Sequence, residues 1–120
     1  MQTRIPTRQR AALERLIRIA QATTGQGQMT ADFLLSWWNA PRFGAFELTK
    51  LWDVAPEIAA DMTTVFTLVV KCRRFPDDLG YDDEFRRIVH TWRPKQEPIL
   101  HKQEELSCVV ASGAEEVDLQ

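Results

Sequence analysis

The densest group of side chains that could perform acid–base or metal chemistry is a set of five carboxylates: Asp77, Asp78, Asp82, Asp83 and Glu84. Two carboxylates that converge in a cleft could act as general acid and base, or could hold a cation. A structural interpretation competes with this one, because Asp82, Asp83 and Glu84 open a predicted helix, where negative charge interacts favourably with the helix dipole. Two of them also stand four positions before an arginine, which is the spacing of helix ion pairs. We favour the structural interpretation.

The sequence also holds the residue types of a Cys2His2 zinc site, namely Cys72, His90, His101 and Cys108. Their spacing does not favour such a site, because the first two fall on different predicted elements and the other two fall near the C-terminus. No phosphate-binding loop or His-Glu-x-x-His motif is present, and Gly25-x-Gly27 follows a predicted helix rather than a strand. We therefore predict that the protein is not an enzyme and uses no metal or cofactor.

Arginines of the first predicted helix form the most distinctive charge pattern. At about 100° per residue they lie on the side of the helix opposite its apolar face: Arg4, Arg8, Arg15 and Arg18. Such a stripe could bind nucleic-acid phosphates or an acidic protein surface. It could equally be a solvated helix face with a chance excess of arginine.

A second candidate surface surrounds the Trp37-Trp38 pair. Adjacent helix positions point about 100° apart, so both indoles cannot face one core directly. Either one of them lies at an edge or interface, where tryptophan is a favoured contact residue, or the helix packs between two neighbours and buries both. Arg42 and Phe43, close to the end of the same helix, complete this group of interaction candidates.

Four segments with helical periodicity must position these residues. The first is predicted over about Arg8–Thr23 with Thr7 as its N-cap, and Gly25 to Gln28 should form the turn after it. The second should run from a Thr30 cap to Asn39, which could cap its C-terminus before Pro41.

The connector from Arg42 to Trp52 is too apolar for a free loop, so we expect a helical turn packed on the core. The third helix should run from an Asp53 cap to about Arg74 and occupy the centre of the bundle, with Phe66 among its inward residues. The fourth should run from Asp82 to Trp92.

Composition agrees with one small all-α domain. The 120 residues are 44% hydrophobic and 27% charged with a net charge of −2, so no global field favours nucleic acid or membrane. The longest apolar stretch is too short to span a membrane, and the N-terminus does not resemble a secretory signal, so we expect a cytoplasmic protein. We predict a helical domain over residues 1–94 with its core at about 8–93, followed by an acidic tail, 95–120, that is partly helical or disordered.

Five segments together resemble a family of short uncharacterised proteins carried on integrative and conjugative elements and plasmids of proteobacteria. They are Ala12–Gln21, Asp32–Asn39, Leu51-Trp52, Phe75–Tyr81 and Trp92-Arg93-Pro94. The resemblance covers about residues 11 to 94, and Trp37-Trp38-Asn39 and Pro76–Tyr81 are its most specific parts. It implies a genetic context but no activity, so it assigns no catalytic or binding residue.

The sequence therefore predicts an all-α bundle of four main helices that acts by binding rather than by catalysis. The preferred function is an interaction protein of a bacterial mobile element that inhibits a host defence complex, in the manner of an anti-CRISPR protein. Its partner would be a host-encoded or element-encoded protein, and a homodimer is also compatible with the sequence. The alternative is a nucleic-acid-binding accessory protein that uses the arginine stripe.

Overall fold

The computed structural model describes residues 5–95 of the chain. In chain order its elements are α1 (Thr7–Ala20), α2 (Gly25–Phe43), the 3-10 helix η1 (Leu48–Trp52), α3 (Pro56–Cys72), the 3-10 helix η2 (Pro76–Leu79) and α4 (Asp82–Trp92). None of the residues between 5 and 95 forms a β-strand. The all-α prediction is confirmed, and the bounds of α4 are those predicted. The predicted acidic tail lies, from residue 96 onwards, outside the described residues, as does Arg4.

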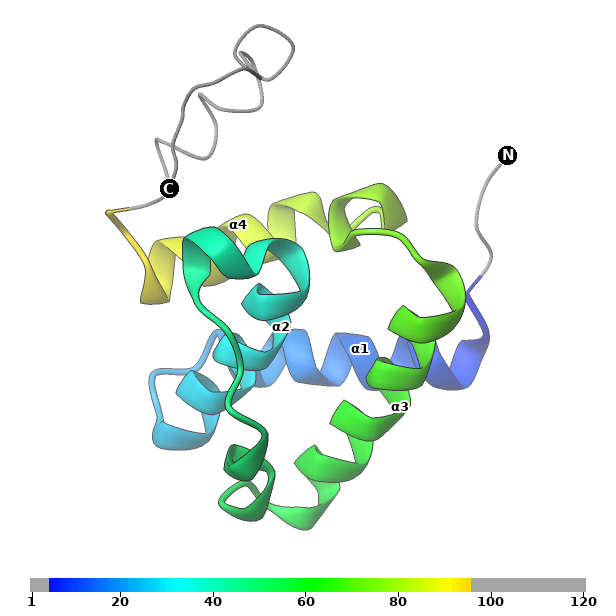
Figure 1. Cartoon of the computed structure of the whole chain (residues 1–120), viewed down its shortest axis with the longest axis horizontal. Coiled ribbons are helices and arrows are strands. Elements are labelled where there is room, and N and C mark those ends of the chain that lie inside the picture. The colour runs from blue at the N-terminus through cyan, green and yellow to red at the C-terminus, as the bar shows by residue number, and fades with distance from the viewer. Residues whose placement is uncertain (1–4, 96–120) are drawn as a thin grey trace, which may run out of the picture.

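Helix α1, rather than α3, holds the central position. It packs against α2, α3 and α4, and in Figure 1 it crosses the molecule behind α2 and α3. Its buried residues recur at helical spacing on one face: Ala12, Leu13, Leu16, Ile17 and Ala20. The prediction that the more apolar α3 is central was wrong, because one flank of α3 faces solvent instead of a neighbouring helix. At its start, Thr7 is the first helical residue and Pro6 stands at the N-cap, so the predicted threonine cap is not made.

Helix α2 begins six residues earlier than predicted, with its N-cap at Thr24 instead of Thr30. Thr24 is its N-cap, and the Thr24 hydroxyl accepts a hydrogen bond from the backbone N–H of Gly27 at 2.9 Å. Thr30, the predicted cap, lies inside the helix, where it is buried and donates to the carbonyl of Gln26. Gly27 does not form a turn. A Cβ at this position would lie 2.0 Å from the carbonyl oxygen of Ala22, so this glycine allows close contact between the start of α2 and the chain leaving α1.

The predicted break at Asn39 is present, but the chain resumes a helical turn after it. Asn39 has φ −163° and ψ 81°, which interrupts the helix two residues before Pro41. Its side-chain oxygen accepts from the backbone N–H of Arg42 at 3.3 Å. Asn39 therefore caps the start of the last turn of α2, and not the end of the preceding segment, and the turn continues to Phe43.

Helix α3 begins at Pro56, with Ala55 and not Asp53 at its N-cap, and it ends at Cys72. Arg73 follows in the left-handed conformation, with φ 54°, which ends the helix and turns the chain towards η2. The face of α3 that packs on the core carries Ile58, Met62, Val65 and Leu68. Phe66, predicted to point inward, is exposed.

Phe85 of α4 lies at the centre of the aromatic core and is fully buried. Trp37 and Trp38 both contact it edge-on, with ring centroids 6.0 and 5.7 Å from that of Phe85. Trp38 also packs against Phe43 at 5.9 Å. Two adjacent indoles thus enclose one phenylalanine from α4, which explains how a tryptophan pair fits a single core.

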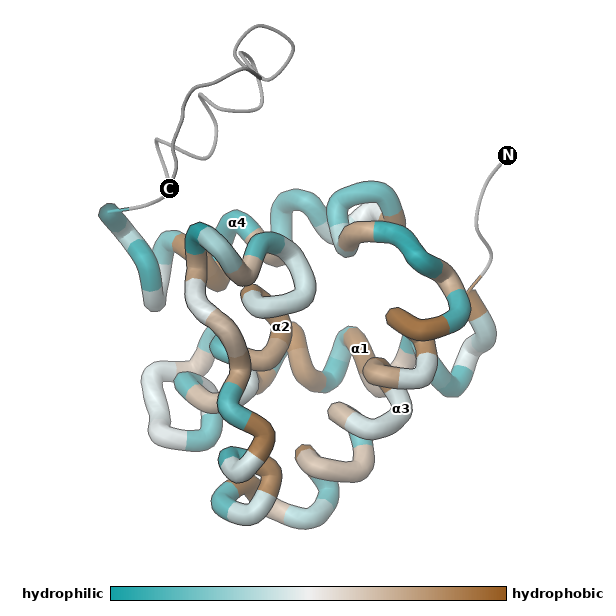
Figure 2. Tube along the Cα trace, in the orientation of Figure 1, coloured by the Kyte–Doolittle hydropathy of each residue, from teal (hydrophilic) through white to brown (hydrophobic). Residues whose placement is uncertain are grey.

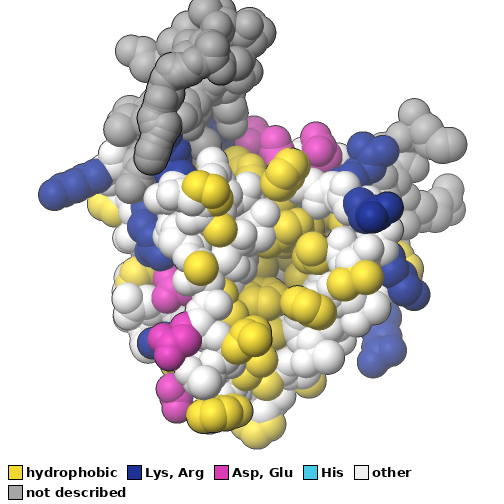
Figure 3. All heavy atoms as spheres, in the orientation of Figure 1, with side chains coloured by type: hydrophobic (Ala, Val, Ile, Leu, Met, Phe, Trp, Pro, Cys, Tyr) yellow, Lys and Arg dark blue, Asp and Glu magenta, His cyan; other side chains and the backbone are white. Residues whose placement is uncertain are grey.

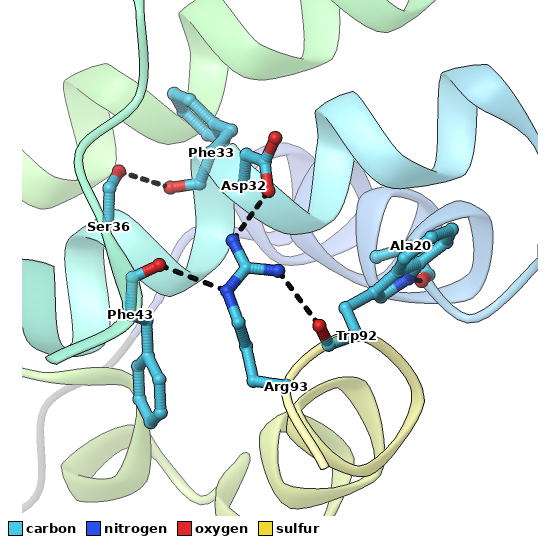
Figure 4. A network of polar contacts seen from close by, with 7 residues as sticks. All are labelled: Ala20, Asp32, Phe33, Ser36, Phe43, Trp92 and Arg93. Carbon is cyan, nitrogen blue, oxygen red and sulfur yellow. Dashed lines mark hydrogen bonds and ion pairs between the residues drawn. The ribbon is translucent and has the colours of Figure 1, made fainter. Parts of the chain in front are cut away.

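Arg93 joins the end of α4 to both parts of α2 (Figure 4). Its Nη2 donates to Asp32 Oδ1 at 2.7 Å, and its Nε donates to the carbonyl oxygen of Phe43 at 3.1 Å. Nη1 donates to the carbonyl of Trp92 at 3.2 Å. The planar guanidinium can serve three acceptors at once, which a lysine could not do in this geometry.

Residues 44–55, the connector between α2 and α3, follow the surface. Gln26 of α2 anchors the end of this connector, because its side-chain oxygen accepts a hydrogen bond from the backbone N–H of Ala55 at 2.9 Å. Figure 2 shows hydrophobic residues along η1 and the end of α3, near the outside of the molecule. Phe46 and Leu51 are partly buried against the core, whereas Leu48 and Trp52 are exposed. The prediction of a short helical turn is confirmed, but the prediction that it packs on the core holds only in part.

Candidate interaction surface

The predicted arginine stripe is divided by one ion pair. The guanidinium of Arg15 donates two hydrogen bonds of 2.8 Å to the carboxylate of Asp61 on α3. The side chain of Arg15 keeps 51% of its surface exposed. This pair raises the pKa of Arg15 further, because the hydrogen bonds and the charge of Asp61 favour the cation. Arg8 and Arg18 are exposed, and within residues 5–95 neither of them forms an ion pair. The stripe therefore offers separated cations rather than one continuous basic surface.

Next to this stripe, Tyr81 accepts a hydrogen bond from Arg10 and donates one to Glu14. The Arg10 Nη1 to Tyr81 Oη distance is 3.1 Å, and the Tyr81 Oη to Glu14 Oε2 distance is 2.9 Å. Burial raises the pKa of Tyr81, and the hydrogen bond to Glu14 raises it further, whereas Arg10 acts in the opposite direction. This network fixes the chain before α4 to the exposed side of α1.

The second predicted group lies largely in the core. Trp38 and Phe43 are only 7% and 3% exposed, and Arg42 is half-buried. Trp37 is half-buried too, and its indole Nε1 donates to the carbonyl oxygen of Arg74 at 3.0 Å. As they lie in the structure, Trp38 and Phe43 stabilise the fold and present little surface to a partner.

Among residues 5–95, five large apolar side chains are exposed instead: Leu48 (68%), Trp52 (82%), Phe66 (60%), Val70 (61%) and Phe75 (56%). They come from η1, α3 and the residues after α3. Figure 3 shows hydrophobic side chains gathered in a band over these elements, in the middle of the face seen in Figure 1. We refer to these five residues as the apolar face.

Helix geometry explains why α3 contributes to this face. Asp61 and Phe66 lie five positions apart, which places them about 140° apart around the helix. Because Asp61 faces Arg15 on α1, Phe66 must point away from α1. Val70 follows one turn later on the same flank, so two large apolar side chains are left without a helix to cover them.

Half-buried aromatic rings from α2 contact the connector and the chain just beyond α3. Phe33 contacts Phe46 of the connector edge-on, with ring centroids 5.3 Å apart. Trp37, one turn further along α2, reaches the carbonyl of Arg74 just beyond α3. Rings of α2 therefore link α2 to the connector and to the chain just beyond α3.

Charged residues of both signs lie on the elements that carry the exposed apolar residues. Along the connector, Glu47 and Asp53 are exposed and Lys50 is half-buried. Exposed basic residues lie at the end of α3, just beyond it and at the start of α1: Lys71, Arg73, Arg74 and Arg8. Figure 3 shows basic side chains on both sides of the view. Apolar and charged side chains thus occur on the same elements, as they do at protein–protein contacts.

The carboxylates and the possible zinc ligands considered above form no metal site within the described residues, and His101 and Cys108 lie outside those residues. Asp82, Asp83 and Glu84 occupy the first turn of α4, and Asp82 pairs with Arg86 at 3.2 Å, as the structural interpretation predicts. Within residues 5–95, no three His, Cys, Asp or Glu side chains converge as metal ligands would. None of the described helices combines the length and hydrophobicity needed to cross a bilayer.

Sequence reasoning did not identify the apolar face, although one signal pointed to it. Helix α3 is apolar over more than half of its circumference, which is more than the contact with α1 can cover. This breadth predicts a central position in the bundle. An uncovered flank at a binding surface produces the same pattern, and only the positions of the neighbouring helices distinguish the two.

Comparison with known proteins places residues 10–93 within a family model described as a family of unknown function, DUF7673. This range agrees closely with the one over which the sequence resembles short uncharacterised proteins. No curated protein and no solved structure gives a significant match to the chain.

Proposed function

The chain belongs to the DUF7673 family, whose function is unknown, and we propose that it is a non-enzymatic protein that acts by binding another protein. The observation that carries the proposal is the exposure of Trp52 together with four other large apolar side chains. Soluble monomers rarely leave such side chains together in water without a partner to cover them. Tryptophan is also among the residues that contribute most to binding when a partner buries it.

The pattern of supporting contacts also favours a binding surface. The rings of Phe33 and Phe46 pack against each other between α2 and the connector, and Trp37 is fixed by its hydrogen bond to the carbonyl of Arg74, just beyond α3. Side chains held in this way lose little freedom when a partner binds, which reduces the entropic cost of association. The proposal therefore moves the binding surface from Trp38 and Phe43 to Trp52 and Phe66.

The resemblance to proteins of proteobacterial mobile elements supports a more specific version of the proposal. Small proteins carried on such elements commonly act on host complexes by occupying a surface. The partner we propose is therefore a host protein, and a component of a defence complex is the leading candidate. This step depends on genetic context rather than on the chemistry of a site, so it stands as a separate part of the proposal.

Affinity purification of the tagged full-length chain from its native bacterium tests the proposal. We expect a host protein to co-purify with the wild type and to be lost with Trp52→Ala. Arg18→Ala is the matched control, since Arg18 is exposed on α1 and has no described ion-pair partner, and this variant should retain the host protein. Equal recovery with wild type and Trp52→Ala, or no co-purifying protein at all, would contradict the proposal.

The same preparation tests nucleic-acid binding. An accessory protein that uses the arginine stripe should carry bound nucleic acid that dissociates as the salt concentration rises. The amount of bound nucleic acid should fall in the double variant Arg8→Ala, Arg18→Ala and should be unchanged in Trp52→Ala. That result would replace the protein-binding proposal.

A further inference from the structure

We propose that the solvent-facing side of α3 packs antiparallel against α3 of a second copy of this chain, about a two-fold axis beside Thr63. The inference goes beyond the proposed function, because it concerns a single helix and depends neither on Trp52 nor on a host protein. We refer to the residues within about 60° of Thr63 around the helix as the outer face of α3: Pro56, Ala59, Ala60, Thr63, Phe66, Thr67 and Val70.

The outer face of α3 is uncharged along its whole length. Its residues are exposed, except for the half-buried Ala59, and Phe66 and Val70 keep 60% and 61% of their surface in contact with solvent. Helix α3 packs on α1 and α2 through its other side, and in Figure 1 no helix lies in front of it. The solvated side of a surface helix is normally polar, so this side has the character of a helix-packing face.

The threonine hydroxyls on this face already have acceptors within α3. Thr63 Oγ1 donates to the carbonyl oxygen of Ala59 at 2.9 Å, and Thr67 Oγ1 donates to that of Thr63 at 3.2 Å. Another helix can therefore bury both side chains without leaving a hydroxyl donor unsatisfied. Because these side chains are also small, the two helix axes can approach closely.

The order of side chains along α3 favours a second α3 as the occupant. Each residue advances about 1.5 Å along a helix, so an antiparallel copy centred on Thr63 places positions that are equally far before and after Thr63 at the same level. Phe66 of one copy then lies level with Ala60 of the other, and Val70 lies level with Pro56. The bulkier side chains occupy one half of the face and the smaller ones the other half, so the face matches itself as a two-fold contact requires.

Charges beside the outer face favour the antiparallel orientation. Glu57 in the first turn of α3 and Lys71 in the last turn are both exposed. They lie about 120° and 80° from Thr63 on the same side of the helix. In the antiparallel pair, Glu57 of each copy lies within about 3 Å, measured along the helix axis, of the level of Lys71 in the other. A parallel pair would bring Glu57 beside Glu57, so opposite charges meet only in the antiparallel one.

Disulfide crosslinking tests the position of the axis. The full-length chain with Cys72→Ser and Cys108→Ser lacks both native cysteines. Thr63→Cys in this background places two thiols beside the axis, where packed helices are close enough for a disulfide, and oxidation with copper phenanthroline should link two copies. Gln28→Cys, at an exposed position of α2, is the control and should remain uncrosslinked. No crosslink at residue 63, or equal crosslinking at both positions, would overturn the inference.

Sedimentation velocity of the full-length chain over a range of concentrations measures the affinity. We expect a monomer–dimer equilibrium in which Thr63→Arg raises the dissociation constant about tenfold or more, because it places two like charges against each other at the axis. Gln28→Arg introduces the same side chain at an exposed position of α2 and should leave the dissociation constant unchanged. Circular dichroism verifies that both variants are folded. A chain that remains monomeric up to the millimolar range, or a dimer that Thr63→Arg does not weaken, would exclude the contact.

A charge reversal tests the orientation of the two helices. Glu57→Lys alone and Lys71→Glu alone each bring like charges together twice in the antiparallel dimer, so each should raise the dissociation constant about threefold or more. The two changes combined in one chain reverse both pairs and should restore an affinity close to that of the wild type. A double variant that dimerises no better than the single variants would contradict the antiparallel arrangement.

These outcomes are separate from those that test the proposed function. A monomeric chain whose host partner is lost with Trp52→Ala rejects the dimer and retains the protein-binding proposal. A dimer that crosslinks through Thr63→Cys, without any co-purifying host protein, retains the dimer and rejects that proposal.

Discussion

The indole Nε1 of Trp92 donates a hydrogen bond of 2.7 Å to the carbonyl oxygen of Ala20. Ala20 is the last residue of α1, so its carbonyl has no N–H partner within that helix. Trp92 is the last residue of α4, and the bond therefore joins the ends of two helices that lie 72 positions apart in sequence.

Replacing Trp92 by Phe should lower the free energy of unfolding by about 1–3 kcal/mol, because the Ala20 carbonyl loses its donor while an aromatic ring remains. Urea denaturation followed by circular dichroism measures this change. Thr91→Ala, one residue earlier on α4, is the control, since its hydroxyl only donates to the Arg87 carbonyl within the same helix. Equal stability of Trp92→Phe and the wild type would show that the hydrogen bond contributes nothing.

Gly27→Ala should destabilise the protein by about 2 kcal/mol or more, because the added Cβ meets backbone atoms that cannot move independently. The carbonyl oxygens of Ala22 and Ile19 would lie 2.0 and 2.9 Å away. Gly25→Ala is a matched control two residues earlier in α2, where no atom lies within 4 Å of the new Cβ. That variant should be neutral or up to about 1 kcal/mol more stable, since alanine restricts the unfolded chain. Thermal or urea unfolding of both variants would refute the close-contact interpretation if Gly27→Ala were the more stable.

Tyr81 is the only tyrosine in the chain, so ultraviolet titration of the phenolate reports this residue alone. We expect a midpoint above 10.0, because burial and the hydrogen bond to Glu14 stabilise the neutral phenol. Glu14→Gln should lower the midpoint towards 10.0. The folded state holds the proton more tightly than the unfolded state. The stabilisation that the fold gains from the raised pKa of Tyr81 is therefore complete below pH 10.0, and it is lost as the pH rises towards the pKa of Tyr81 in the folded state. Tyr81→Phe should lack this contribution to alkaline destabilisation.

Arg93→Lys should cost about 1–3 kcal/mol although it preserves the charge, because a lysine cannot reach Asp32 and the Phe43 carbonyl together. The guanidinium spans both acceptors at 2.7 and 3.1 Å. Arg87→Lys on the exposed side of α4 is the matched control and should change the unfolding free energy by less than about 0.5 kcal/mol. Similar stability of the two variants in urea would show that the charge alone is sufficient at residue 93.

The helices could be predicted where periodicity and end signals agree. Helix α4 has apolar residues at regular helical spacing, acidic residues in its first turn and Pro94 beyond its end, and its predicted bounds match the structure. The start of α2 could not be predicted in the same way. Two glycines near each other favour a turn by local rules, yet both lie in the first turn of α2, and the close carbonyl of Ala22 leaves room only for a glycine at position 27.

The candidate surface was harder to predict than the fold, because hydrophobicity does not indicate which neighbour covers a side chain. Phe85 and Trp52 are both large and apolar, yet one is fully buried and the other is 82% exposed. Their difference depends on where α1 and α2 lie relative to them, which neither local spacing nor composition contains. The Arg15–Asp61 pair likewise joins residues 46 positions apart, so the division of the arginine stripe was not visible in the sequence.

The hydrogen bond between Arg93 and the end of α2 also determines where the chain can change in length. An extra residue between Leu34 and Trp38 would rotate everything beyond it by about 100° about the helix axis and would carry the Phe43 carbonyl away from Arg93. Insertions and deletions should therefore be rejected within α2. They should be accepted between residues 44 and 47, where the chain is neither helical nor fully buried. A library of single-residue insertions, scored for soluble expression, would reveal this boundary.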